Sequence, residues 1–202
     1  MKIESIAVIG AGTIGRGIAY AAALGGFRTV LEDVSASTLE EGMAYIRASL
    51  DDGVARAKLT AEARDLALGC ISTSSVVEEA CRRGDLLIEA VPEDMETKLE
   101  IFTLFDKFAR PGAIFASNTS SLSVTEMATI TFCPERCIGM HFFNPVPKMK
   151  LLEIVRALET SEETLRACVE AGGRMAEKVV VVKETLDYYP ADPCADWERG
   201  VS

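Results

Sequence analysis

The chain contains a single histidine, His141, whose position suggests that it takes part in chemistry. It ends an apolar run, residues 137–141, that predicts a β-strand. Ligands of open α/β sheets bind outside the carboxyl ends of the strands, and an imidazole titrates near neutral pH, so His141 is a candidate acid or base. The alternative is a core histidine, hydrogen-bonded beside the two phenylalanines that follow it. The pattern of residues leaves both interpretations open.

The second candidate is a glycine-rich turn, Gly10-Ala11-Gly12-Thr13-Ile14-Gly15, which matches G-x-G-x-x-G. It follows an apolar run, residues 3–9, and opens an alanine-rich helical stretch. In this context the first glycine permits the turn, the second lets the backbone approach a diphosphate, and the third lets helix and strand pack closely. The helix then points free N–H groups at the phosphates. The candidate dinucleotide-binding residues are Gly10, Gly12, Thr13, Ile14 and Gly15. A turn kept only for packing is the alternative.

An acidic residue stands where a dinucleotide needs one. Asp33 follows the next strand-like run, 18 residues after Gly15, where a carboxylate can accept hydrogen bonds from the adenosine ribose. Glu32 and Asp33 are both acidic and no arginine follows, so a 2′-phosphate would be repelled. We therefore predict NAD rather than NADP, and the alternative for Asp33 is an ordinary surface charge.

The composition excludes several classes of function. A net charge of −10 argues against sequence-independent binding of nucleic acid, which requires Lys and Arg. No stretch reaches the roughly 18 apolar residues that cross a bilayer, so we expect no membrane association and a cytoplasmic location. The six cysteines form no C-x-x-C pair and only one histidine is present, so we expect reduced thiols and no metal site.

These candidates need a framework of alternating strands and helices. Apolar runs at 3–9, 27–31, 70–72, 85–90, 113–117, 137–141, 151–155 and 179–182 predict strands. Helical patterns cover 13–24, 35–50, 60–68, 75–81, 95–108 and 162–178. This order predicts an α/β fold, a Rossmann-type doubly wound, mostly parallel sheet, with a helical hairpin inserted after Asp33.

Three further segments carry a family resemblance. In order and spacing, Ala116-Ser117-Asn118-Thr119-Ser120-Ser121-Leu122, His141-Phe142-Phe143-Asn144-Pro145 and Lys150-Leu151-Leu152-Glu153-Ile154-Val155 resemble the signature of the L-3-hydroxyacyl-CoA dehydrogenases. The resemblance covers residues 1–185. It implies an acyl-CoA substrate and NAD-dependent oxidation of an L-3-hydroxyacyl-CoA to the 3-ketoacyl-CoA, as in fatty-acid β-oxidation.

The resemblance also implies roles for single residues. His141 corresponds to the general base that takes the proton of the 3-hydroxyl, and Glu153 to the glutamate that orients and polarises this imidazole. Ser120 corresponds to the serine that hydrogen-bonds the reacting oxygen, and Asn144 to the asparagine that contacts the nicotinamide end of NAD.

Four more residues correspond to ligand contacts of the family. Glu93 and Lys98 fall where the family touches NAD, although without the resemblance they read as the first turn of a solvated helix. Ser49 and Lys58 fall on the predicted hairpin, where the family binds the nucleotide part of CoA. For both, a solvated helix face is the alternative.

The sequence departs from the family after Thr185. We expect residues 1–185 to form the NAD-binding domain and 186–202 to be a tail unlike the family, with the family's C-terminal helical domain absent. Such a loss would expose apolar surface, favour a homo-oligomer and impair turnover. The alternatives are an NAD-binding module without effective catalysis and a dehydrogenase of a hydroxy or sugar acid that carries no CoA.

Overall fold

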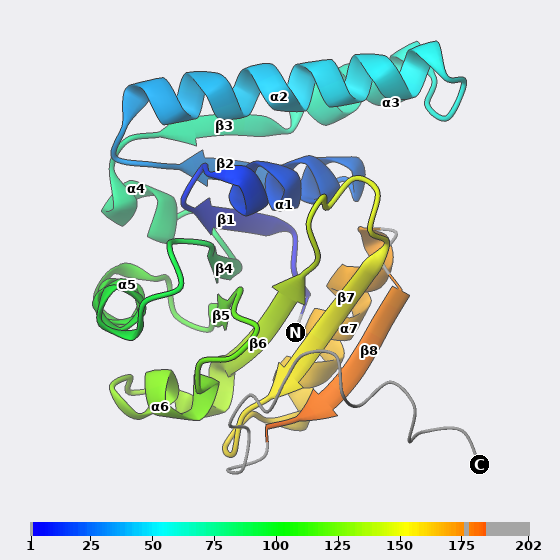
Figure 1. The fold of residues 1–202 in the computed structure, drawn as a ribbon. Helices are drawn as coiled ribbons and strands as arrows, with labels where there is room; N and C mark the ends of the chain where they lie inside the picture. The colour runs from blue at the N-terminus through cyan, green and yellow to red at the C-terminus, as the bar shows by residue number, and fades with distance from the viewer. Residues whose placement is uncertain (1, 176–177, 185–202) are drawn as a thin grey trace, which may run out of the picture.

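The computed structural model describes residues 2–175 and 178–184, and these form one open α/β sheet with helices on both faces (Figure 1). Within the described residues the sheet has eight strands in the order β3-β2-β1-β4-β5-β6-β7-β8. The strands are β1 (Ser5–Ile9), β2 (Arg28–Glu32), β3 (Ile71–Ser74), β4 (Leu86–Glu89), β5 (Ile114–Ser117), β6 (Cys137–Phe142), β7 (Leu151–Arg156) and β8 (Lys178–Lys183). Neighbouring strands are parallel except for β6 and β7, which are antiparallel.

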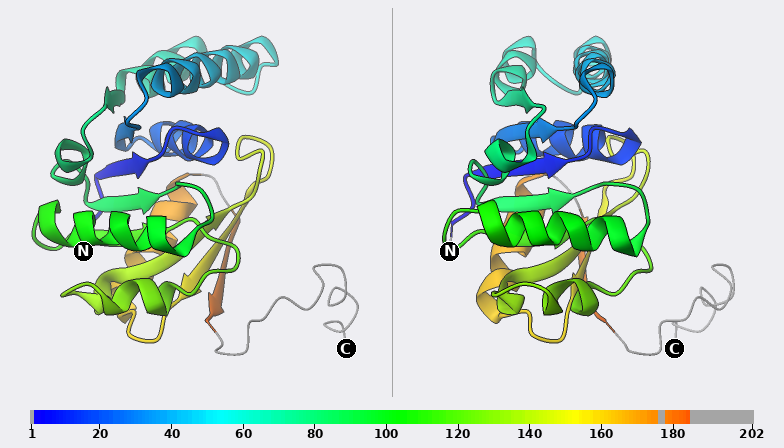
Figure 2. Two further views of the ribbon diagram at one scale, coloured as in Figure 1. Left: turned by 60° about the vertical axis from the view of Figure 1, so that its left-hand side comes forward. Right: turned by 90° about the vertical axis from the view of Figure 1, so that its left-hand side faces the viewer.

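Two layers of helices bury the faces of this sheet (Figure 2). The helices are α1 (Thr13–Leu24), α2 (Ala36–Ala55), α3 (Ala61–Gly69), α4 (Val77–Cys81), α5 (Met95–Phe108), α6 (Val124–Thr129) and α7 (Glu162–Arg174), with a short 3-10 helix at Pro134–Arg136. Buried residues of α1, α2 and α7 share one hydrophobic cluster, and those of α4, α5 and α6 share the other. The central strands β1, β4 and β5 are buried along their whole length, as parallel strands between two layers must be.

Local sequence signals fix where the helices begin and end. Side chains of Ser35, Thr60, Asp94, Ser123 and Ser161 cap the first turns of α2, α3, α5, α6 and α7 by accepting a backbone N–H. Gly25 and Gly26 follow the end of α1, and Gly26 has a φ of 75° that favours glycine. The helices α2 and α3 form the inserted hairpin, beside the β3 edge of the sheet (Figure 1).

The predicted fold class is confirmed, with differences in detail. Helix α6 was not predicted from the sequence, and α4 begins two residues later than the pattern indicated. Helix α7 ends at Arg174, before the predicted end at 178. The predicted tail, residues 186–202, lies outside the described residues. In the part of the chain that is described, no helix is long and apolar enough to span a membrane.

The sheet topology brings four loops together. Strands β1, β4, β5 and β6 run parallel, so their carboxyl ends share one edge of the sheet. The loops that leave this edge begin at Gly10, Ala90, Asn118 and Phe143. They carry five of the residues that the sequence marks as candidates: Gly10, Gly12, Glu93, Ser120 and Asn144.

Candidate active site

The glycine turn after β1 has the geometry of a phosphate cradle. Gly10 has a φ of 99°, and a Cβ there would lie 2.8 Å from the Ala90 carbonyl oxygen. A Cβ on Gly15 would lie 1.8 Å from the Gly10 carbonyl oxygen, so α1 packs directly against the turn. A Cβ on Gly12 would meet nothing within 4 Å, which leaves open space in front of the first turn of α1. No side chain caps this helix, so its first N–H groups are available to a diphosphate, and the residues fit a dinucleotide.

Asp33 ties the cradle to the next helix. Its Oδ2 accepts a hydrogen bond from Ala11 N at 3.0 Å, and its Oδ1 accepts one from Ser35 N at 2.9 Å. A carboxylate has about four lone-pair sites, so acceptor capacity remains for ribose hydroxyls. Asp33 therefore stands at the predicted position, where it also holds the turn.

Glu32 differs from the sequence expectation. Its side chain is 2% exposed, and burial, with the charges of Asp33 and Glu78, raises its pKa to about 7. Near neutral pH a large fraction of this carboxyl is protonated. The expected repulsion of a 2′-phosphate therefore falls more on Asp33 than on Glu32.

His141 and Glu153 form a pair across the β6–β7 ladder. The two residues are direct partners in the antiparallel register, so their side chains lie on the same face of the sheet. His141 Nδ1 lies 3.3 Å from Glu153 Oε2, and both side chains keep some solvent exposure, 17% and 33%. The His141 ring also packs on Phe143, with ring centroids 4.3 Å apart. The imidazole thus has a carboxylate at Nδ1 and keeps part of its surface exposed.

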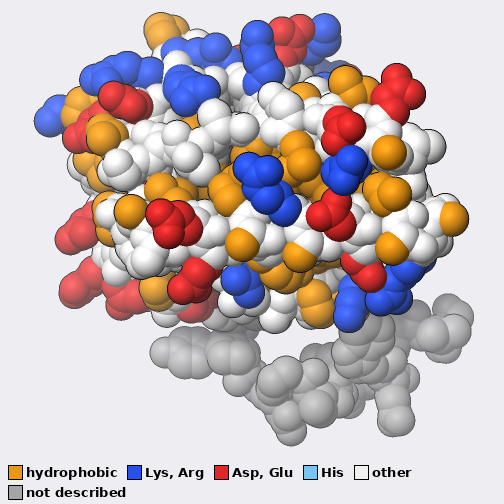
Figure 3. All heavy atoms as spheres, turned by 90° about the horizontal axis from the view of Figure 1, so that it is seen from above, with side chains coloured by type: hydrophobic (Ala, Val, Ile, Leu, Met, Phe, Trp, Pro, Cys, Tyr) orange, Lys and Arg blue, Asp and Glu red, His pale blue; other side chains and the backbone are white. Residues whose placement is uncertain are grey.

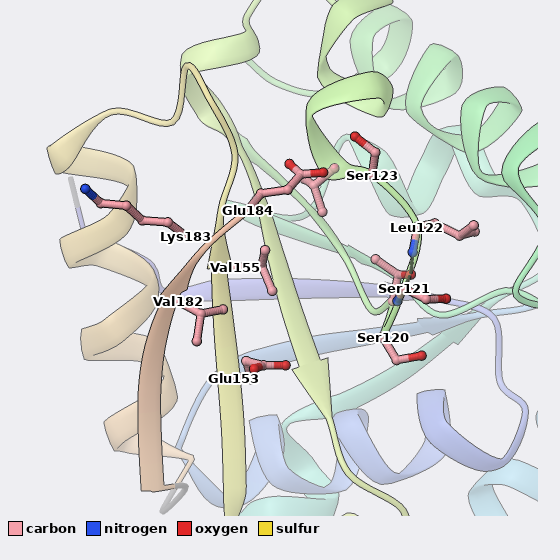
Figure 4. A pocket seen from close by; sticks show the side chains of 11 residues that line it. Ser120, Ser121, Leu122, Ser123, Glu153, Val155, Val182, Lys183 and Glu184 are labelled. Carbon is pink, nitrogen blue, oxygen red and sulfur yellow. Dashed lines mark hydrogen bonds between the residues drawn. The ribbon is translucent and has the colours of Figure 1, made fainter. Parts of the chain in front are cut away.

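Ser120 shares a cavity with Glu153. The cavity has a volume of about 360 Å³ and lies between the loop that follows β5 and the ends of β7 and β8. Figure 4 shows Ser120 and Glu153 at the same end of this cavity, with Val155 and Val182 further along. The sheet therefore brings Ser120, Glu153 and, through Glu153, His141 into one neighbourhood.

Glu93 and Lys98 belong to a buried charge cluster. Lys98 on α5 is completely buried, and its Nζ lies 2.9 Å from both carboxylate oxygens of Glu89 and 3.2 Å from Glu93 Oε2. Ser117 also donates a hydrogen bond to Glu89, at 2.6 Å. The interpretation of Lys98 as part of a solvated helix turn is wrong, because its ammonium is enclosed by protein groups. That Lys98 contacts NAD stays a prediction.

The remaining candidates lie apart from this cluster. Asn144 is exposed, three residues after His141, on the loop that leaves the sheet edge. Ser49 is half-buried on α2, and Lys58 is exposed in the turn between α2 and α3. In both views of Figure 2, as in Figure 1, α1 lies between this hairpin and the β6–β7 pair. Ser49 and Lys58 therefore lie apart from the imidazole, and their contact with a ligand stays a prediction.

Two residues near the site were not assigned from the sequence. Asn118 Oδ1 accepts a hydrogen bond from Phe142 N at 2.9 Å, which ties the loop after β5 to the strand of His141. Glu89 accepts hydrogen bonds from Lys98, Ser117 and Val91 N. The signal for Asn118 was its place in the SNTSS segment. The signal for Glu89 was a charge at the end of an apolar strand, which should have indicated a buried partner.

The described residues also include most of the cysteines. Five of the six cysteines are free thiols there, and Cys194 lies outside that part of the chain. No cluster of His, Cys, Asp and Glu residues in the described ranges could hold a metal ion.

Comparisons with known proteins identify the family. Residues 5–185 match the family model described as 3-hydroxyacyl-CoA dehydrogenase, NAD binding domain. The chain is 41% identical over 184 residues to a probable 3-hydroxybutyryl-CoA dehydrogenase of Bacillus subtilis, and 42% identical over 182 residues to a 3-hydroxybutyryl-CoA dehydrogenase of Bradyrhizobium diazoefficiens. These matches cover 91% and 90% of this chain, but it spans only 64% and 62% of the two relatives.

A solved structure gives the same result. The (S)-3-hydroxybutyryl-CoA dehydrogenase of Ralstonia eutropha matches with a TM-score of 0.87 and 37% identity. The match covers 91% of this chain and 65% of that one. The similarity therefore extends over most of this chain and leaves about a third of the longer protein without a counterpart in the match.

Proposed function

The chain belongs to the 3-hydroxyacyl-CoA dehydrogenase family through its NAD-binding domain, and from this premise we propose that it takes part in oxidising an L-3-hydroxyacyl-CoA to the 3-ketoacyl-CoA. NAD is the cofactor of this domain. The observation that carries the proposal is the pairing of His141 with Glu153, 3.3 Å apart, at the sheet edge that also holds the glycine turn. Because the chain spans 64% of the first relative, the activity and the substrate are proposals for this protein.

The histidine would act as the base. Glu153 faces Nδ1, which favours the tautomer with its proton on that nitrogen and leaves the lone pair of Nε2 free for the substrate. In the oxidation direction Nε2 takes the proton of the 3-hydroxyl as hydride leaves C3. The imidazolium formed in this step is stabilised by the carboxylate of Glu153. NAD, when bound, supplies the acceptor for the hydride.

Other residues would bind and orient the reactants. The turn from Gly10 to Gly15 would hold the diphosphate with its backbone N–H groups, and Asp33 would accept hydrogen bonds from the adenosine ribose. Asn144 would contact the nicotinamide end. The Ser120 hydroxyl would donate a hydrogen bond to the 3-oxygen as negative charge develops there, which is the usual task of such a donor.

We further propose that the α2–α3 hairpin receives the nucleotide part of CoA, with Ser49 and Lys58 as contacts. Ion pairs on and beside the hairpin join Asp52 to Arg56 and Arg64 to both Asp51 and Asp65. Figure 3 shows basic, acidic and apolar side chains mixed on this face. A CoA titration by calorimetry tests this step, with Ser49→Ala and Lys58→Ala each expected to weaken binding. Unchanged affinity in both variants would contradict these two contacts, whereas absence of CoA binding to the parent would favour a substrate without CoA.

The experiment that tests the whole proposal is NADH oxidation in the presence of acetoacetyl-CoA. We expect turnover that disappears in His141→Ala, while NADH still binds, because the cradle and the imidazole lie on different strands. Equal turnover with and without the imidazole contradicts the assigned chemistry. Saturable NADH binding without turnover of the unsubstituted chain would instead favour a dinucleotide-binding module. We also propose residues 1–185 as the unit that binds NAD.

A further inference from the structure

The loop that carries Ser120 is held by one carboxylate. Glu93 Oε1 accepts hydrogen bonds from Thr119 Oγ1 at 2.5 Å, from Ser120 N at 3.2 Å and from Ser121 Oγ at 3.3 Å. Glu93 lies in the loop between β4 and α5, whereas the other residues follow β5. The contacts therefore join two separate loops of the sheet edge.

Thr119 is the centre of this arrangement. Its hydroxyl donates to Glu93 and accepts the backbone N–H groups of Ser121 and Leu122, at 3.3 and 2.9 Å. The side chain is 4% exposed, so water cannot easily replace these bonds. Because its hydroxyl both donates and accepts hydrogen bonds, Thr119 fixes the path of the backbone that carries the exposed Ser120.

Glu93 is itself held by Lys98. Its second oxygen, Oε2, lies 3.2 Å from the buried Lys98 ammonium, which is in turn paired with Glu89. Burial raises the pKa of Glu93, but the hydrogen bond from Thr119 and the charge and hydrogen bond of Lys98 outweigh it, so the net pKa is lowered. The group therefore stays an ionised acceptor at neutral pH, and charged acceptors make the stronger hydrogen bonds.

We propose that Glu93, held by Lys98, is a positioning residue that keeps the Ser120 hydroxyl at the mouth of the cavity shared with Glu153. The inference rests on the proposed function, in which Ser120 donates to the reacting oxygen. A donor on an exposed loop is effective only when its loop is rigid, because small displacements from the reactive geometry are costly. The hydrogen bonds of Glu93 to the loop supply that rigidity without contact with the substrate.

The test compares Thr119→Val, which removes the hydroxyl, with Thr119→Ser, which retains it. In Thr119→Val we expect faster amide hydrogen exchange over residues 119–122 and a kcat lowered by up to about 100-fold. NADH affinity should stay within about twofold, because the diphosphate cradle is untouched. Thr119→Ser should resemble the parent in all three measurements. Thr103→Val removes an exposed hydroxyl on α5 and serves as the matched control, with no change expected.

A second variant, Glu93→Gln, tests the proposal in case Thr119→Val does not fold. Glu93→Gln keeps the shape of the side chain but leaves one acceptor oxygen for the loop and Lys98, so exchange over 119–122 should rise and kcat should fall. Equal behaviour of Thr119→Val and Thr119→Ser would overturn the proposal. So would a loosened loop with an unchanged kcat. Absence of turnover in the parent would count against the proposed function, whereas the exchange data would still decide whether Glu93 and Thr119 hold the loop.

Discussion

Replacing Lys98 by methionine should destabilise the fold strongly, and more so at high pH. Lys98 and Glu89 have no solvent exposure, and the substitution leaves Glu89 with only the donors Ser117 Oγ and Val91 N. Removing one partner of a buried pair costs about 3–5 kcal/mol, because a buried charge loses its compensation. We expect a loss of this size in the free energy of unfolding near about pH 8.

The dependence on pH has a definite sign. Burial already raises the pKa of Glu89 against the opposing effect of Lys98, and without the lysine the folded-state pKa rises further. The folded variant then binds a proton that the unfolded chain has released, so stability falls as pH rises from the ordinary glutamate pKa, about 4.5, through the folded one. The penalty should therefore shrink toward about pH 5.

Urea denaturation followed by circular dichroism measures this directly. The double variant Glu89→Gln with Lys98→Met should regain much of the lost stability, because it removes both charges. Arg56→Met, which breaks an exposed pair with Asp52, is the control and should change little. The reasoning is refuted if Lys98→Met loses less than about 1 kcal/mol near pH 8, or if its loss is the same at both pH values.

Three further predictions concern the two halves of the site. Glu153→Gln should lower kcat about 100-fold or more with little effect on NADH affinity, measured by steady-state kinetics beside the exposed control Glu159→Gln. Gly12→Ala should keep its melting temperature but weaken NADH binding, since its Cβ meets no protein atom, whereas Gly15→Ala should melt earlier because its Cβ would strike the Gly10 carbonyl. Glu32→Gln should gain stability relative to the parent as pH rises from about 4.5 through about 7, by on the order of 3 kcal/mol. The reason is that the parent carboxyl, with its raised pKa, must ionise in a buried site. A stability difference between variant and parent that stays constant across this pH range would contradict the assignment.

The residues of the site that lie close together in the sequence could be predicted from the sequence alone. The glycine turn and Asp33 follow from the strand–turn–helix rhythm, because phosphate binding at a helix N-terminus constrains consecutive residues. The strands around His141 were also evident, but its pairing with Glu153 rested on the family resemblance. Periodicity gives no strand direction, and only the antiparallel β6–β7 register puts the two side chains face to face.

The part that depends on distant partners could not be predicted. The contact between Thr119 and Glu93 joins residues 26 apart, and no local pattern specifies it. The sequence places Lys98 in the first turn of a helix, where it resembles a solvated charge. In the structure it has no solvent exposure and is paired with Glu89 of β4. Buried ion pairs of this kind become visible only when the sheet order is known.

The antiparallel direction of β7 limits which insertions and deletions this protein can tolerate. Side chains alternate between the two faces of a strand, so a slip of one residue would turn Glu153 toward the α7 layer and bring Leu152 or Ile154 beside the imidazole. A carboxylate would then enter an apolar interior while the base lost its partner. Insertions in the exposed stretch 148–150 of the β6–β7 connection should be better tolerated than a single deletion within the strand, which should cost both solubility and activity.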